Sequence, residues 1–251
     1  MLTLAQLSMD FASNTPIQSL TLYLFFAGTV AMGAGATYFL TERSSVAPQY
    51  RSAMTVSGLI CGIAAFHYYK MTSQYMSGGE FPTALRYVDW LFTTPLLLLK
   101  FPLLLQMREG SKRLVTQLIA LDVLMIVTAF IAETSPTGSV AWWGFFLLAC
   151  GFELAIVAVL YFQMSNAIKD APWQIAAAVR TMRLFILVGW AIYPIGFLLA
   201  LGGAGEYREI AYNVSDVINK VGFGLVAYAG IKALSTGEGA VKGFRTEAHT
   251  A

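Results

Sequence analysis

Seven long apolar runs fill most of the 251-residue chain and restrict its fold more than any other feature. A helix needs roughly 20 apolar residues to cross a bilayer core, and each run has about that length. Inside lipid a segment must satisfy its own backbone hydrogen bonds, and the runs lack the alternation of a membrane barrel. We therefore predict an all-α membrane protein, a seven-transmembrane-helix bundle with helices at approximately 18–43, 48–76, 82–107, 112–134, 139–166, 172–202 and 206–235.

The connectors and the distribution of charge predict one domain and its orientation. Only 12% of the residues are charged, and the short connectors leave no space for a second domain. With the N-terminus outside, all Lys and Arg residues except Lys70, Arg86, Arg208 and Lys220 lie toward the inner side. This positive-inside bias predicts an outside N-terminus and a cytoplasmic C-terminus. The net charge of +2 follows from the same asymmetry, so we expect the lipid bilayer, and no nucleic acid, as a partner.

The stretch RYVDWLFTTPLLLLK, residues 86–100, places ionisable side chains inside the third apolar run. At about 100° per residue on a helix, Arg86, Asp89, Thr93 and Lys100 fall within a wedge of about 60°. Charged groups inside a membrane usually face the bundle interior or a water pathway, so this column predicts a functional path. In the alternative interpretation, Arg86 and Lys100 extend to opposite membrane surfaces and Asp89 is only their partner.

Lys220, in DVINKVGFG, lies in the middle of the seventh run, four residues after Asp216 and on the same helix face. Burial favours the uncharged, nucleophilic form of an amine, which is the form that reacts with an aldehyde to give a Schiff base. Once protonated, such a Schiff base requires carboxylate counterions, and Asp89 and Asp216 are the available pair. The alternative is a Lys220–Asp216 salt bridge that only fixes helix packing.

Three motifs resemble the signatures of the microbial (type I) rhodopsins: RYVDWLFTTPLLL, RLFILVGWAIYPIG and DVINKVGFG. The resemblance covers all seven helices and extends to proteorhodopsin-like proton pumps of the subgroup with lysine at the cytoplasmic donor position. It implies that residues 1–251 form a single seven-helix retinal-binding domain in the cell (inner) membrane of a prokaryote. It also implies that Lys220 carries all-trans retinal as a protonated Schiff base.

The resemblance implies roles for individual residues. Asp89 would be the primary counterion and proton acceptor, with His67 as its partner, and Asp216 would be the second counterion. Arg86 would organise the outward exit path, and Tyr68 would hydrogen-bond near Asp216. The positions that match the family's retinal pocket are Tyr87, Trp90, Thr94, Leu97, Met125, Trp190, Tyr193 and Pro194.

Third-helix positions indicate which ion such a protein would move. Asp89 argues against the chloride pumps, which lack this carboxylate, and Thr93 argues against the sodium pumps, which carry aspartate there. Outward proton pumping remains, with Lys100 as candidate proton donor in place of the usual Asp or Glu, and Leu97 implies green-light absorption. One alternative is a sensory photoreceptor that signals through a partner protein, although a cytoplasmic donor favours a pump. A light-independent transporter is the third candidate.

Several residues stand apart from this pattern. Glu153 falls on the ring side of the retinal pocket, where relatives carry an aromatic residue or methionine, so it must be protonated, hydrogen-bonded or turned toward a neighbouring subunit. Glu206 and Glu209 are expected to be solvated at the outer surface. Cys61 and Cys150 show no pairing or metal-ligand pattern, so we predict small buried side chains and no metal site. We further expect a homo-oligomer, no transducer protein, and a transporter instead of an enzyme.

Overall fold

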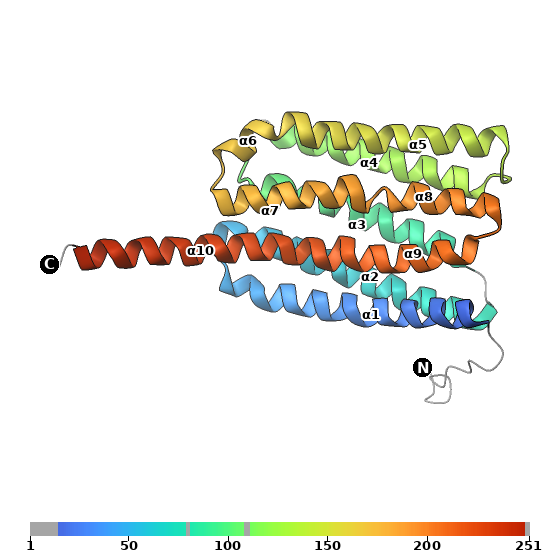
Figure 1. Cartoon of the computed structure of the whole chain (residues 1–251), viewed down its shortest axis with the longest axis horizontal. Coiled ribbons are helices and arrows are strands. Elements are labelled where there is room, and N and C mark those ends of the chain that lie inside the picture. Colours follow the sequence, from blue (N-terminus) through green and yellow to red (C-terminus); the bar gives the residue numbers. More distant parts are fainter. Residues whose placement is uncertain (1–14, 79–80, 108–110, 249–251) are drawn as a thin grey trace.

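The computed structural model describes residues 15–78, 81–107 and 111–248. Every regular element within these ranges is helical, and Figure 1 shows the long helices side by side in one bundle. The first helix, α1 (Pro16–Glu42), begins at one end of the bundle, and the last, α10 (Phe223–Ala248), leaves at the other end. The fold class predicted from the apolar runs is confirmed.

The first four predicted helices are each one continuous α-helix, whereas the last three are interrupted. The continuous helices are α1, α2 (Arg51–Gly78), α3 (Thr83–Leu104) and α4 (Ser111–Thr134). The interrupted ones are α5 (Val140–Ala158) with η5 (Val159–Gln163), then α7 (Trp173–Leu184) with η6 (Phe185–Gly189) and α8 (Ile192–Leu199), and finally α9 (Gly205–Val217) with η8 (Ile218–Gly222) and α10. Short helices η3 (Arg43–Ser45), η4 (Pro48–Tyr50), α6 (Ser165–Asp170) and η7 (Ala200–Gly202) lie in the connections.

Local sequence explains where several of these helices begin and end. Thr15 forms a capping box with Gln18 at the start of α1, and Pro16 occupies the first turn, where its missing N–H is harmless. The Ser139 hydroxyl caps α5 by accepting a hydrogen bond from the Trp142 N–H. No proline follows residue 223, and α10 continues to Ala248, beyond the predicted end at residue 235.

The interruptions η5, η6 and η8 are π-helical turns, a geometry that is rare and often marks functional sites. In the sixth helix, the Trp190 N–H donates to the Phe185 carbonyl oxygen at 3.1 Å, and α8 begins two residues later. Pro194 lies in the first turn of α8 and cannot donate a backbone hydrogen bond, which favours a break at this point. These wide turns place Trp190 and Lys220 toward the bundle interior, where both are buried.

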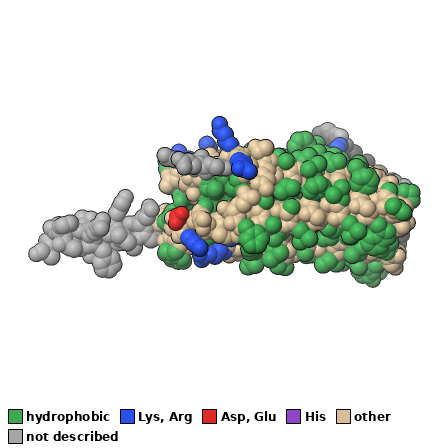
Figure 2. Space-filling model, turned by 90° about the horizontal axis from the view of Figure 1, so that it is seen from above, with side chains coloured by type: hydrophobic (Ala, Val, Ile, Leu, Met, Phe, Trp, Pro, Cys, Tyr) green, Lys and Arg blue, Asp and Glu red, His purple; other side chains and the backbone are tan. Residues whose placement is uncertain are grey.

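The distribution of polar and apolar side chains is the reverse of that in a water-soluble protein. Six of the described helical segments are long and apolar enough to cross a membrane, and α2 has the length but a lower mean hydropathy. Large apolar side chains are exposed along the outer surface, and Figure 2 shows them over most of one long face of the bundle. The interior instead holds the charged side chains of Arg86, Asp89, Lys100, Asp122, Asp216 and Lys220. This is the arrangement of a multi-pass membrane protein with a polar path through its centre.

Close helix packing positions one of the interior polar groups. Gly28 of α1 lies against the ring of Tyr68 in α2, and a Cβ added at Gly28 would lie 2.6 Å from Tyr68 Cε1. The absence of a side chain at Gly28 therefore lets Tyr68 lie fully buried between α1 and the bundle core. α1 also packs against α9, so the first and last transmembrane segments are neighbours.

Candidate functional site

The centre of the site is the amine of Lys220, which η8 places between two carboxylates. Lys220 Nζ lies 2.7 Å from Asp89 Oδ2 of α3 and 3.3 Å from Asp216 Oδ2 of α9. At most 2% of each of these three side chains is exposed. Buried charges are tolerated only when they are paired and hydrogen-bonded, and here the pairing joins two helices that are distant in sequence. The structure thus brings together the three residues that the sequence predicts to converge.

Asp216 is held by several donors. Its carboxylate accepts hydrogen bonds from Tyr68 Oη at 2.8 Å, Tyr193 Oη at 2.6 Å and Trp90 Nε1 at 3.1 Å. Arg86 Nη1 also lies 3.6 Å from Asp216 Oδ2. The predicted contact of Tyr68 with Asp216 is present. This set of donors from three helical segments, α2, α3 and α8, fixes the orientation of the carboxylate and compensates its burial.

Asp89 is held much less tightly. Its Oδ2 pairs with Lys220, whereas its Oδ1 accepts no hydrogen bond from any described residue and lies 3.5 Å from His67 Nδ1. The same His67 nitrogen lies 3.0 Å from the carbonyl oxygen of Ile63, one helical turn away. The structure therefore places His67 beside Asp89, as the sequence predicts. Thr93 lies on the same face of α3, but its hydroxyl donates to the backbone oxygen of Asp89 at 2.9 Å and not to the carboxylate.

Lys220 lines a cavity inside the bundle. Mostly apolar walls with a few polar groups are typical of small-molecule sites. Two aromatic contacts shape its walls: the rings of Trp90 and Tyr193 meet edge to face with centroids 4.8 Å apart, and Phe146 stacks on Phe197 at 4.8 Å. The cavity is lined by all the residues predicted for a pocket, namely Tyr87, Trp90, Thr94, Leu97, Met125, Glu153, Trp190, Tyr193 and Pro194, together with Asp216 and Lys220.

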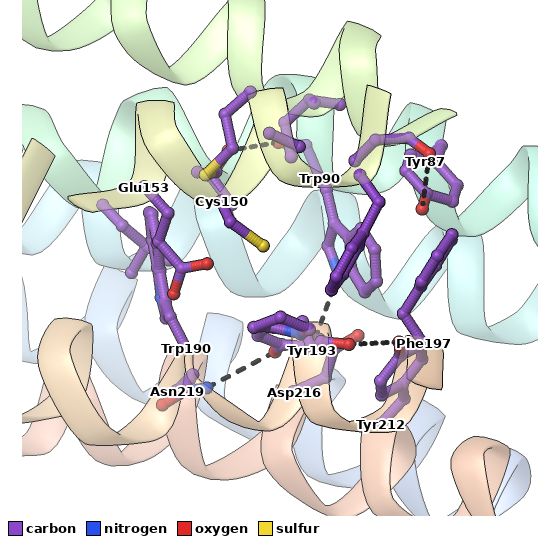
Figure 3. Close-up of a pocket in the computed structure, with 18 of the residues that line it drawn as sticks. Tyr87, Trp90, Cys150, Glu153, Trp190, Tyr193, Phe197, Tyr212, Asp216 and Asn219 are labelled. Atoms are coloured by element: carbon purple, nitrogen blue, oxygen red, sulfur yellow. Dashed lines mark hydrogen bonds between the residues drawn. The ribbon is translucent and has the colours of Figure 1, made fainter. Parts of the chain in front are cut away.

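The remaining cavity residues are absent from the predicted set: Ile126, Ala129, Phe146, Ala149, Cys150, Phe197, Tyr212 and Asn219. Most are apolar residues that no motif distinguishes from ordinary core. Cys150 is half-buried and faces this cavity, so its prediction as a small core side chain is corrected. Asn219 lines the cavity (Figure 3), and it donates to the Gly189 carbonyl oxygen at 3.1 Å and so joins η8 to η6, next to Lys220 in the sequence.

Asp122 of α4 is a buried carboxylate that is missing from the predicted site. Its Oδ2 accepts a hydrogen bond from Thr94 Oγ1 at 2.8 Å, while its Oδ1 has no hydrogen-bond partner in the described parts of the chain. The signal that could have found it is plain in the sequence, because an aspartate in LIALDVLMI meets the criterion applied to Asp89. Asp122 supports a pocket-lining residue from behind, since Thr94 lines the cavity.

Lys100 lies on α3 at the end of the polar column opposite to Arg86. The side chain is completely buried, and its Nζ makes no hydrogen bond with a residue that the structure describes. Its Nζ lies over the ring of Phe223, 4.7 Å from the ring centroid. Lys100 therefore does not extend to the membrane surface, and the alternative interpretation of the column does not apply to it.

Arg86 leads from Asp216 into a second buried network at the opposite end of the column. Arg86 Nη2 lies 2.7 Å from Glu209 Oε2 and 2.9 Å from Asn213 Oδ1. Glu209 also pairs with Arg208 at 3.2 Å, and Arg208 pairs with Glu133 at 2.6 Å. The expectation that Glu209 is solvated is wrong, because its side chain is 4% exposed and two arginines neutralise it.

Comparisons with known proteins agree with this geometry. Residues 19–234 match the family described as bacteriorhodopsin-like protein. The chain is 34% identical over 213 residues to the green-light absorbing proteorhodopsin of Gamma-proteobacterium EBAC31A08, covering 81% of this chain and 83% of that protein. The crystal structure of Exiguobacterium sibiricum rhodopsin superimposes with a TM-score of 0.80 and 43% identity, covering 86% of this chain and 97% of that one.

Xanthorhodopsin, described as a light-driven ion pump with dual chromophore, gives a TM-score of 0.83 at 29% identity, with 90% of this chain and 97% of that chain covered. Similarity in sequence and in structure therefore extends over all the helices that carry the buried lysine, its two carboxylates and the cavity. The chain belongs to the bacteriorhodopsin-like family and is a type I rhodopsin of the proteorhodopsin-like kind.

Proposed function

We propose that the protein is a light-driven outward proton pump that binds all-trans retinal as a protonated Schiff base at Lys220. The observation that carries this proposal is the position of Lys220, which lines the cavity and whose Nζ lies 2.7 Å from Asp89 Oδ2. Membership of the family and the description of xanthorhodopsin as a light-driven ion pump support it.

The residues that line the cavity suit retinal in their chemistry. Its walls are mostly aromatic and aliphatic, which matches a flat polyene, and a single amine lies among them to condense with an aldehyde and release water. Trp90, Trp190 and Tyr193 would hold the chain of the ligand and exclude water from it. Bound there, retinal supplies absorption of visible light and a double bond that isomerises.

Asp89 is better suited than Asp216 to accept a proton from the Lys220 nitrogen. Asp216 already accepts hydrogen bonds from three side chains, which a proton on its carboxylate would disturb. Asp89 has a free Oδ1 with His67 beside it, so its carboxyl can be protonated without breaking a hydrogen bond to another described side chain. A group with this geometry, in contact with the donor atom, meets the requirement for a general base.

The two ends of the polar column on α3, at Arg86 and at Lys100, would provide the exit and the entry for the proton. Arg86 connects the site to Glu209, Arg208 and Glu133, and this network would carry the proton outward. At the other end, keeping a charge on Lys100 is costly because no carboxylate within the described ranges pairs with it, so this side chain is suited to carrying a proton only transiently. Figure 2 shows Lys and Arg side chains near the end from which α10 extends, which supports a cytoplasmic position for that end.

Illumination of bacterial cells that express the protein tests the proposal. With added all-trans retinal, green light should acidify the medium, and an uncoupler should abolish the change because the movement of protons is then short-circuited. Cells without retinal and cells with Asp89→Asn serve as controls. A coloured protein that changes no pH would favour the sensory alternative, and a protein that never becomes coloured would favour a light-independent transporter.

Other expectations accompany this function. We propose that residues 1–251 act as one domain in the inner membrane of a prokaryote, that the protein forms a homo-oligomer without a transducer, and that Leu97 gives green absorption. Size-exclusion chromatography with light scattering in detergent measures the oligomeric state. An absorption spectrum of the purified pigment measures its colour.

A further inference from the structure

The wall of the cavity that faces the seventh helix contains a polar group that the proposed function does not use. Glu153 and Cys150 are one turn apart on α5, and both line the cavity. Figure 3 shows their carboxyl and thiol groups directed into it, across from Asp216 and Asn219 of the seventh helix. Glu153 therefore lies across the cavity from the helix that carries the amine, where the part of the ligand away from its aldehyde would lie.

Glu153 differs from the other interior carboxylates. Asp89, Asp122, Glu133, Glu209 and Asp216 each pair with a named side chain. Glu153, by contrast, makes no hydrogen bond and no ion pair with any residue in the described ranges. The cavity lining is mostly apolar, and residues such as Met125 and Ile126 offer no strong donor. A carboxyl group that loses water to an apolar neighbour without gaining a partner is unfavourable.

A retinal with a plain hydrocarbon ring would leave Glu153 without a hydrogen-bond partner, because the ring would exclude water from the carboxyl group without donating to it. A hydroxyl on the ring would donate a hydrogen bond to the carboxyl oxygen, and it could do so whether the acid is ionised or neutral. A ring ketone could pair only with the neutral acid. A site with a buried hydrogen-bonding group discriminates strongly against ligands that leave this group unpaired.

We propose that Glu153 makes this pocket selective for a retinal whose ring carries a hydroxyl group. This inference rests on the proposed function, since it takes Lys220 as the attachment point of the aldehyde. Glu153 is then a residue that determines specificity for the ligand, and it takes no part in the movement of protons.

Competition between aldehydes tests this inference. Retinal-free membranes of the full-length protein are incubated with equal excess amounts of all-trans retinal and all-trans 3-hydroxyretinal, and in a second series with all-trans 4-hydroxyretinal. The bound chromophores are released with hydroxylamine and quantified as oximes. The compared proteins are the unmodified chain, Glu153→Leu, Glu153→Gln and, as a matched control at the surface end of α9, Glu206→Gln.

For at least one hydroxylated aldehyde, we expect the bound ratio of hydroxylated to plain retinal to be about tenfold higher in the unmodified chain than in Glu153→Leu, which is the effect of one good hydrogen bond. Glu153→Gln should keep part of this preference because its amide oxygen still accepts, and Glu206→Gln should keep all of it. Equal ratios in the unmodified chain and in both Glu153 variants would overturn the inference while leaving the proposed function intact. If no aldehyde gave a coloured pigment, the proposed cofactor and this inference would fail together.

Discussion

Asp89 and Asp216 contact the same amine but have different surroundings. Asp216 accepts hydrogen bonds from Trp90, Tyr68 and Tyr193, whereas Asp89 has one unpaired oxygen near His67. Two chemically identical side chains thereby become suited to different tasks, one to remaining a fixed counterion and the other to taking up a proton. The difference arises from their neighbours on other helices and not from the carboxylates themselves.

Replacing Asp89 with Asn should therefore abolish pumping while leaving pigment formation possible. The amide cannot accept the proton, and loss of a positioned base costs on the order of 100-fold or more in rate. Light-dependent acidification by cells reports the rate, and the absorption maximum should move to longer wavelength because the negative charge beside Lys220 is removed. Normal acidification by Asp89→Asn would show that another group is the acceptor.

Lys100 allows a similar prediction for the return of the proton. Lys100→Ala should slow the last phase of the photocycle, because the buried amine of α3 that is the proposed proton donor would be missing. Flash-induced absorbance changes, followed until the dark spectrum returns, measure this phase. Lys70→Ala, an exposed change in α2, is the matched control, and an equal recovery in both variants would remove Lys100 from the proton path.

Glu209 shows what a buried charge contributes to stability. Glu209→Ala leaves Arg86 and Arg208 without their shared partner, and removal of one member of a buried ion pair costs about 3–5 kcal/mol. Glu206→Ala, three residues earlier and only partly buried, should change the free energy of unfolding by less than about 0.5 kcal/mol. Thermal denaturation in detergent compares the two, and equal midpoints would contradict the buried network.

Helix contacts depend on small residues as much as on polar ones. Gly28 and Gly33 both lie in α1, but only Gly28 faces a neighbouring ring, that of Tyr68. A Cβ at Gly33 would meet no atom within 4 Å. The two positions thus separate the effect of a glycine on helix propensity from its effect on packing between α1 and α2.

Gly28→Ala should destabilise the protein by roughly 1–3 kcal/mol, because the new methyl group forces the Tyr68 ring to move. Gly33→Ala should be neutral or stabilising by up to about 1 kcal/mol, since alanine favours a helix interior. Thermal denaturation again measures both. Gly28→Ala should also alter the absorption maximum, because Tyr68 donates to Asp216, and an unchanged spectrum would show that Tyr68 keeps its position.

Across the molecule, the sequence predicts the bundle and the centre of the site, because both depend on local patterns. The apolar runs define the helices, and the charges inside these runs identify Asp89, Asp216 and Lys220. Asp122 meets the same criterion and could have been predicted. Glu209 could not, because the segment GGAGEYREI resembles a surface turn until Arg86 of α3 is placed beside it. The π-helical turns that aim Trp190 and Lys220 inward have no clear signal in sequence either.

The proposed orientation makes a prediction for the whole chain. α10 extends beyond the bundle (Figure 1), and the sequence there contains Lys242 and Arg245, which trypsin recognises. If the C-terminus is cytoplasmic, trypsin should shorten the protein in inside-out vesicles and leave it intact in whole cells. Immunoblotting with a C-terminal tag detects the difference, and cleavage in intact cells would reverse the assigned orientation.

The short distance between Lys220 and Asp89 also determines where electrical work is done. A proton that crosses 2.7 Å traverses about a tenth of a hydrocarbon core that is roughly 30 Å thick. Against 100 mV, which opposes a full crossing by about 2.3 kcal/mol, this step encounters at most about 0.2 kcal/mol. If Lys220 transfers its proton to Asp89 as proposed, this step is therefore almost electrically silent. Most of the electrogenic movement belongs to the longer thermal steps at both ends of the column, so membrane voltage should slow the recovery of the pump far more than its first proton transfer.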